Sequence, residues 1–266
     1  MASHDSVSAR PRVALFVTCL VDALFPDAGR ATVRLLERLG QPLEFPLEQS
    51  CCGQMHANSG YFELELVRRY LEAFSPYDAV VVPSGSCAAS IRHQHPMIAR
   101  AAGDHALAAR AEAVAGRTYE LSQFLLDVLG IDDVGAYFPH CVTYHPTCHS
   151  LRLLGVGDRP LRLLRKVRGI DLVELPRRDE CCGFGGTFAV KNPDVSAAML
   201  ADKMEAVIET GAEVLCASDR SCLMHIGGGL ERIRAGVRTL HLAEILAATE
   251  TEDGVGNPPA ATKAPT

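Results

Sequence analysis

The residues LEFPLEQSCCG (43–53) and LVELPRRDECCG (172–183) each place a short apolar run before two adjacent cysteines and a glycine. Such a run is typical of a buried strand. Neighbouring strand residues point to opposite faces of a sheet, so both cysteines can serve one site only where the backbone leaves the β conformation. The glycine that follows permits this turn, and it also permits a close approach of the backbone to a bound group.

The remaining cysteines repeat with nearly the same spacing. Cys19 precedes the first pair by 31 intervening residues, and Cys148 precedes the second pair by 32. One further cysteine follows each pair, namely Cys87 in the first half and Cys222 in the second. Internal self-similarity of this kind indicates a tandem duplication.

Strand and helix patterns alternate between the cysteines, which is typical of βαβ units with a mostly parallel sheet. The strands are expected at 13–17, 43–47, 79–82, 142–144, 172–175 and 214–217, and the helices at 30–39, 61–74, 98–115, 159–167 and 195–208. We therefore predict an α/β protein of two tandem, related Rossmann-like domains, residues 12–133 and 134–248. Polar tails at 1–11 and 249–266 are expected to be disordered.

Each cysteine position follows a predicted strand by a few residues. In an open parallel sheet the strand ends that precede a crossover helix lie along one edge, where such folds bind ligands. We therefore expect four thiols to converge in each half. The glycine that follows each cysteine pair is expected to approach the bound group through its backbone. The candidate metal ligands are Cys19, Cys51, Cys52, Cys87, Cys148, Cys181, Cys182 and Cys222, and the two glycines are Gly53 and Gly183.

Composition narrows the class of protein. A chain of 266 residues with 48% hydrophobic residues can bury a core without disulfides, and its net charge of −6 argues against binding to nucleic acid. The apolar run at 13–21 ends at Asp22 without a cleavage site, and no window reaches the ~18 apolar residues of a membrane span. We expect a cytoplasmic protein, where repeated cysteines indicate metal or redox chemistry.

The spacing favours an iron-sulfur cluster over zinc. Four-cysteine zinc sites typically use two Cys-x2-4-Cys pairs, which neither half contains, whereas a cluster accepts cysteines from separate elements. A zinc-binding scaffold and a thiol-disulfide protein that uses the adjacent pairs remain as alternatives. No flavin or nicotinamide motif is present. His145 and His149 flank Cys148 and could tune a cluster or replace a thiolate, but hydrogen-bonded loop histidines are the simpler interpretation.

Four longer motifs carry a resemblance to a known family: PSGSC (83–87), YHPTCHSLR (144–152), CCGFGGTFAVKNPDVSAAM (181–199) and SDRSCLMHIGGG (218–229). Over residues 12–247 the chain resembles the cysteine-rich CCG domain in duplicate, in the form found in the A-type component of the lactate-utilisation iron-sulfur oxidoreductase complex. The corresponding component of heterodisulfide reductase, its B-type component, is similar at greater distance.

This resemblance implies an iron-sulfur electron-transfer subunit of a complex that oxidises L-lactate to pyruvate. Removal of two electrons from lactate is usually the work of a flavin, a nicotinamide or a metal centre, so we expect an electron carrier rather than a complete enzyme. The chain lacks the cysteine run of bacterial ferredoxins, so a ferredoxin-type partner subunit is expected to supply it. Peripheral membrane association is compatible with this picture.

The chain departs from the heterodisulfide reductase form at one position in each half. That form ends in Cys-x2-Cys, which gives five thiolates per site and a non-cubane cluster, whereas Ser84 and Asp219 occupy the first of these two positions here. A four-cysteine [4Fe-4S] cluster, one or two per chain, is therefore the simpler expectation. Ser84 and Asp219 are candidate accessory residues. Cys216 is a third, although a buried strand cysteine is the favoured interpretation.

Overall fold

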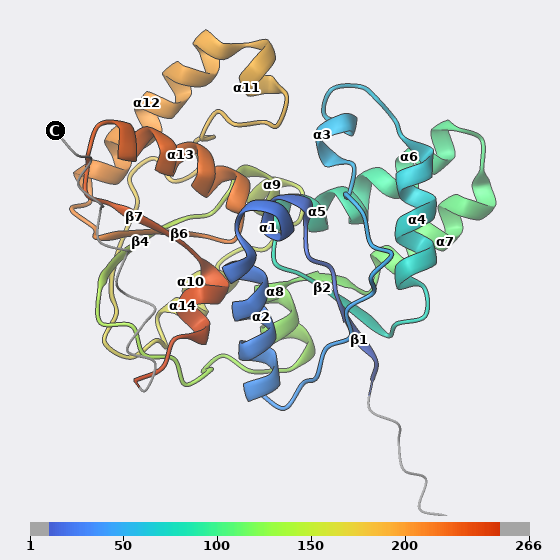
Figure 1. The fold of residues 1–266 in the computed structure, drawn as a ribbon, viewed down its shortest axis with the longest axis horizontal. Helices are drawn as coiled ribbons and strands as arrows, with labels where there is room; N and C mark the ends of the chain where they lie inside the picture. The colour runs from blue at the N-terminus through green and yellow to red at the C-terminus, as the bar shows by residue number, and fades with distance from the viewer. Residues whose placement is uncertain (1–10, 251–266) are drawn as a thin grey trace, which may run out of the picture.

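The computed structural model describes residues 11–250, so most of the two expected tails lies outside the described residues. It contains two parallel sheets, one in each half, with helices packed around them (Figure 1). This confirms the predicted α/β class. The first sheet is formed by β1 (Val13–Leu15), β2 (Ala79–Val82) and β3 (Thr118–Glu120), and the second by β4 (Cys141–His145), β5 (Asp171–Val173), β6 (Val214–Ala217) and β7 (Arg238–His241).

Helical segments connect and cover the strands, and no helix within residues 11–250 is long and apolar enough to span a membrane. The first half contains α1 (Cys19–Leu24), α2 (Pro26–Arg38), α3 (Gln54–Ala57), α4 (Leu64–Phe74), α5 (Gly85–Ala89), the π-helical η1 (Ser90–Gln94), α6 (His95–Ala101), α7 (His105–Ala115), α8 (Leu121–Gln123) and the π-helical η2 (Phe124–Val128). The second contains α9 (Cys148–Arg152), α10 (Arg159–Leu164), α11 (Phe188–Lys191), α12 (Pro193–Glu209), α13 (Arg220–Arg232) and α14 (Leu242–Ala247).

Both sheets follow one strand order. The second sheet runs β5-β4-β6-β7, and the first runs β1-β2-β3 with an isolated bridge beside β1 where a counterpart of β5 would lie. Glu44 makes this bridge: its N–H donates to the Val13 carbonyl, and its carbonyl accepts from the Leu15 N–H, both at 2.8 Å. The expected strand at 43–47 is thus wrong beyond one residue, because Pro42 and Pro46 have no N–H to extend the ladder.

Other differences from the expected elements have local causes. The helix expected at 98–115 is two helices, since Gly103 adopts a positive φ of 76° and the Asp104 carboxylate accepts the Leu107 N–H at 2.9 Å to begin α7. The short strands β3 and β7 were not predicted, because each has only three or four residues and polar side chains interrupt the apolar pattern.

The two halves exchange their last helices. α14 of the second half packs on α2 of the first, and α8 of the first packs on α10 of the second (Figure 1). Arg38 secures one exchange by donating to the carbonyls of Leu246 and Ala247, both at 2.7 Å. One hydrophobic core contains buried residues of both sheets, including Val81 and Val214. The halves therefore form a single packed body.

The two halves also meet at Gly85. Its N–H donates to the Ser218 carbonyl at 3.2 Å, and α5 packs on α9. A Cβ at this position would lie 1.6 Å from Ser150 Oγ, so only glycine fits between the two helices.

We predict that Gly85→Ala lowers the free energy of unfolding by about 1–3 kcal/mol, because the added methyl overpacks this contact. Urea denaturation measures the loss, and Gly85→Ala combined with Ser150→Gly should recover part of it. Gly116→Ala is the control, since its Cβ would meet nothing closer than 3.5 Å and its φ is −63°. Equal stability of Gly85→Ala and Gly116→Ala would contradict the packing described.

Glu120, the last residue of β3, is fully buried and begins α8 as its N-cap. One carboxylate oxygen accepts the Ser122 N–H at 2.8 Å, whereas Oε1 has no partner. Burial raises the pKa of Glu120 to about 7. The folded state therefore holds a proton that the unfolded state releases near pH 4.5. Glu120 costs stability increasingly as the pH rises from there toward 7.

We predict that Glu120→Gln gains stability over the wild type as the pH rises, reaching about 3 kcal/mol above pH 7 and vanishing below pH 4.5. The amide keeps the capping oxygen and removes the buried charge. Urea denaturation at pH 5 and pH 8 tests this. Glu37→Gln, at an exposed position of α2, is the control. A difference between wild type and Glu120→Gln that does not change with pH would refute the prediction.

Candidate metal centres

The structure brings the four cysteines of the first half together around one pocket at the edge of the first sheet. Cys19 begins α1 after β1, and Cys87 lies in the first turn of α5 after β2. Cys51 and Cys52 come from the loop before α3, and the Sγ atoms of Cys19 and Cys51 are 3.8 Å apart. We call these four residues the first set.

The second half repeats this arrangement. Cys148 begins α9 after β4, and Cys222 lies in the first turn of α13 after β6. The Sγ atoms of Cys148 and Cys181 are 3.9 Å apart. The Sγ atoms of Cys182 and Cys222 lie within 4.8 Å of each other, and both residues are buried. These four residues are the second set. The order of the strands thus gathers four thiols in each half, at two separate places.

A left-handed glycine turns each adjacent pair toward its set. Gly53 has a φ of 79° and Gly183 a φ of 89°, in the region that favours glycine. Their N–H groups donate to Sγ of Cys51 and Cys181 respectively, both at 3.4 Å. A Cβ at Gly183 would also lie 2.6 Å from the Ser196 carbonyl oxygen. The glycine therefore approaches the sulfur through its backbone.

One thiol in each set is stabilised as a thiolate. Hydrogen bonds from the Cys19 and Cys52 thiols lower the pKa of Cys51, and the Gly53 N–H adds to the effect. The pKa of Cys19 rises for the reciprocal reason, because its proton is held in the bond to Cys51. The second set shows the same pattern, with the pKa of Cys181 lowered. The thiolate is the form that binds metals.

Burial divides each set in the same way. The side chains of Cys52, Cys87, Cys182 and Cys222 are buried, whereas Cys51, Cys148 and Cys181 are half-buried and Cys19 is exposed. Each set therefore has two thiols shielded from water and two near the surface. A bound group would lie shallowly beneath the surface, with its inner side dry.

Ser84 and Asp219 are the N-caps of the helices that carry the last cysteine of each set. The Ser84 hydroxyl oxygen accepts the Cys87 N–H at 3.3 Å, and Asp219 Oδ1 accepts the Ser221 N–H at 3.1 Å. The two caps also meet each other: Asp219 Oδ2 accepts the Ser84 hydroxyl at 3.2 Å and the Ser86 N–H at 2.9 Å. Both residues therefore join the halves, and both line the pocket of the first set.

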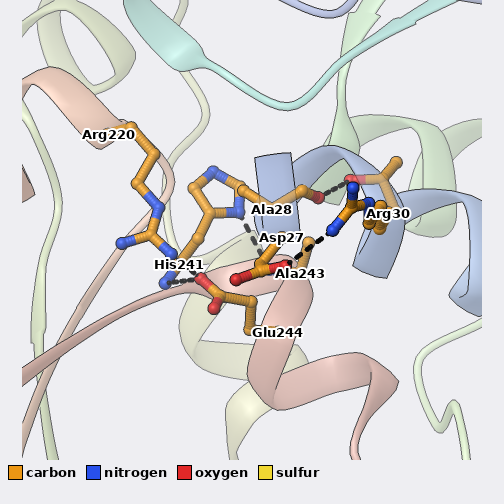
Figure 2. Close-up of polar contacts among 8 residues, drawn as sticks. Asp27, Ala28, Arg30, Arg220, His241, Ala243 and Glu244 are labelled. Carbon is orange, nitrogen blue, oxygen red and sulfur yellow. Dashed lines mark hydrogen bonds and ion pairs between the residues drawn. The ribbon is translucent and has the colours of Figure 1, made fainter. Parts of the chain in front are cut away.

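The second half also contributes an arginine to the pocket of the first set. Arg220, which follows Asp219, is buried, lines the pocket and pairs with the buried carboxylate of Glu244 (Figure 2). The Glu244 carboxylate also accepts the His241 N–H at 2.8 Å. The guanidinium carbon lies 5.1 Å from the centre of the Phe25 ring. A guanidinium held in place by its ion pair with Glu244 therefore lines the same pocket as the thiols of the first set.

The other cysteines lie apart from both sets. Cys216 packs in the core shared by the two sheets, while its neighbours Leu215 and Ala217 face Cys182 and Cys222. Because side chains alternate along a strand, Cys216 points away from the second set. Cys141 lies at the opposite end of β4 from that set.

The two histidines near Cys148 differ in their surroundings. His149 is hydrogen-bonded as expected: its Nδ1 lies 3.6 Å from Cys148 Sγ and its Nε2 lies 3.3 Å from Gln54 Nε2. For His145 the same expectation is wrong. It is the last residue of β4 rather than a loop residue, it is buried, and neither ring nitrogen has a hydrogen-bonding partner. Its ligand atom lies within 4.8 Å of those of Cys182 and Cys222.

Comparisons with known proteins agree with the repeat. The cysteine-rich domain family CCG matches residues 13–92 and again 142–227. Lactate utilization protein A of Exiguobacterium sp. is 49% identical over 240 residues, which cover 89% of this chain and 97% of that protein. Lactate utilization protein A of Geobacillus thermodenitrificans is 48% identical over 237 residues, which cover 88% of this chain and 98% of that protein.

The fold also occurs among solved structures. A crystal structure of a hypothetical protein from Helicobacter pylori matches with a TM-score of 0.62 at 12% sequence identity. The match covers 89% of this chain but 48% of the other, so this chain spans about half the length of that protein.

We predict that Asp219→Asn lowers the free energy of unfolding by about 1–3 kcal/mol, because the carboxylate accepts bonds from both halves. Ser84→Ala should cost less, and the double variant should cost less than the sum of the two, because the residues share one hydrogen bond. Urea denaturation measures all three. Asp158→Asn is the control, since Asp158 caps α10 without a side-chain bond. If Asp219→Asn were as stable as this control, Asp219 would not stabilise the contact between the halves.

Proposed function

Because this chain belongs to the family of duplicated CCG cysteine-rich proteins that includes lactate utilization protein A, we propose that it is an iron-sulfur electron-transfer subunit in the oxidation of L-lactate to pyruvate. The observation that carries the proposal is the pair of four-cysteine sets, built alike in two halves. An iron-sulfur cluster is normally held by four cysteine thiolates, and it can take them from separate elements.

The residues present fit such a cluster. All ten cysteines lie among the described residues and none forms a disulfide, which accords with a reducing compartment such as the cytoplasm. In each set one thiol is already stabilised as a thiolate, and a glycine N–H donates to its sulfur. Hydrogen bonds to cluster sulfurs help to set the reduction potential.

We assign the cluster ligands to the eight cysteines of the two sets, and a [4Fe-4S] cluster to each. Asp219 supports four rather than five protein ligands in the second half. Its two oxygens accept bonds from Ser84, Ser86 and Ser221, so its lone pairs are already used. Ser84 likewise caps its helix. These hydrogen bonds support accessory roles for both residues in holding the cysteines rather than the metal.

When bound, such a cluster passes one electron at a time. The chain's own residues would hold it with one side dry and the other, next to Cys19, near the surface. An electron can therefore reach a partner subunit without a path through the core. We propose that a ferredoxin-type iron-sulfur protein is one such partner.

A zinc-binding scaffold is the second candidate, and one observation favours it. His145, Cys182 and Cys222 lie close enough for one ion, and three cysteines with one histidine form an ordinary structural zinc site. Metal analysis separates this candidate from the first.

We predict that the anaerobically purified protein contains iron and acid-labile sulfide, and that the dithionite-reduced protein gives a low-temperature EPR signal of a [4Fe-4S] cluster. Cys52→Ser and Cys182→Ser should each remove about half of the iron if each set holds one cluster, since each removes one of four thiolates. Cys141→Ser is the control at the far end of β4. Stoichiometric zinc without iron, even after reconstitution with iron and sulfide, would overturn the proposal in favour of the scaffold.

A further inference from the structure

The two halves differ at one position shortly before their first cysteine. In the first half this residue is Phe16, three positions before Cys19, and its buried ring packs edge-on against Phe74 with 5.3 Å between the ring centroids. In the second half it is His145, three positions before Cys148 and equally buried. The repeat thus places an imidazole where its counterpart has an apolar ring.

The imidazole of His145 has no hydrogen-bonding partner at either nitrogen. Among residues 11–250, two other histidines are as deeply buried, and each uses one nitrogen. His95 Nε2 lies 2.8 Å from the Cys52 carbonyl oxygen, and His241 Nδ1 accepts the Ala243 N–H at 3.1 Å. Buried polar groups are nearly always paired, so a wholly unpaired imidazole calls for a ligand that the protein atoms do not supply.

The neighbours of His145 indicate that ligand. One of its ring nitrogens and the sulfurs of Cys182 and Cys222 lie within 4.8 Å of one another, and all three side chains are buried. They come from β4, from the loop before α11 and from α13, so the fold rather than the local sequence brings them together.

We propose that His145 is a metal ligand in the second set, where it takes the place of one of the four thiolates assigned above, so that three thiolates and one imidazole hold the second centre while four thiolates hold the first. The inference rests on the proposed function, because it concerns the same bound cluster. A neutral imidazole in place of an anionic thiolate raises the reduction potential of a cluster, as in Rieske centres. The second centre is therefore the more easily reduced of the two.

Pulsed EPR tests the ligand directly. The full chain is reconstituted anaerobically with iron and sulfide, with natural or ¹⁵N-labelled histidine, and is then reduced. The wild type should show a strongly coupled imidazole nitrogen that changes with the label. His145→Phe, which installs the residue of the first half, and His145→Cys, which offers a thiolate instead, should both lose this coupling. His145→Cys should keep its iron, with a lower midpoint potential for the second centre.

Two other histidines beside the second set serve as controls. His149 has Gln54 as a partner, and His225 Nε2 lies 3.4 Å from the Ser196 hydroxyl. The variants His149→Gln and His225→Gln should keep the nitrogen coupling. Loss of the coupling in either of them, or its survival in His145→Cys, would overturn the assignment.

The outcomes also separate this inference from the proposed function. A chain that takes up no iron and sulfide overturns the proposed function, and this inference with it. A chain that holds a cluster without a coupled nitrogen overturns the inference alone. If both His145 variants fail to fold, which circular dichroism reveals, the labelled wild type still decides whether a histidine binds, and the two controls decide whether it is His149 or His225.

Discussion

The parallel direction of the strands is the constraint on which both cysteine sets depend. Cysteines at distant positions meet only because every strand of a sheet ends at the same edge, where the segments that follow β1, β2, β4, β5 and β6 carry the thiols. A single antiparallel strand would send its cysteine to the far side of the molecule. Two adjacent side chains must also face one site, and the left-handed glycine after each pair allows this. Its N–H also donates to the sulfur of the first cysteine of the pair. The helices around the sheets mainly hold these turns in place.

Duplication has produced two sites with the same frame and different surroundings. Both sets share the spacing of their cysteines, the glycine turn and the stabilised thiolate. The two sets differ in the residues beside their cysteines, where Phe16 corresponds to His145 and Ser84 to Asp219. The first set also faces residues of the second half, including Arg220, across the contact between the halves. Two sites that began alike have in this way come to differ in the side chains around their thiols.

Much of this could be predicted from the sequence, because the spacing of the cysteines and the apolar runs before them are local signals. The fold class and the grouping of the cysteines followed from those signals alone. The length of the strand expected at 43–47 was overestimated, because the apolar pattern was given more weight than Pro42 and Pro46, and only Glu44 pairs with β1. The meeting of Ser84 with Asp219 and the unpaired ring of His145 could not be predicted, because both depend on contacts between segments far apart in the chain. A sequence shows that a histidine is present, but only the packed structure shows whether it has a partner.

The exchanged helices and the joined caps say something about how such a chain can have arisen. In a single half, the surface on which the last helix of the other half packs would be uncovered. Two identical halves could cover this surface in each other by exchanging their last helices. In such a symmetric dimer the cap residue near the axis meets its own copy, so an aspartate there would face an aspartate, and two buried carboxylates would repel each other. Fusion into one chain removes this restriction. Ser84 can then donate to Asp219, and a contact between unlike residues replaces one that symmetry had forced to be alike.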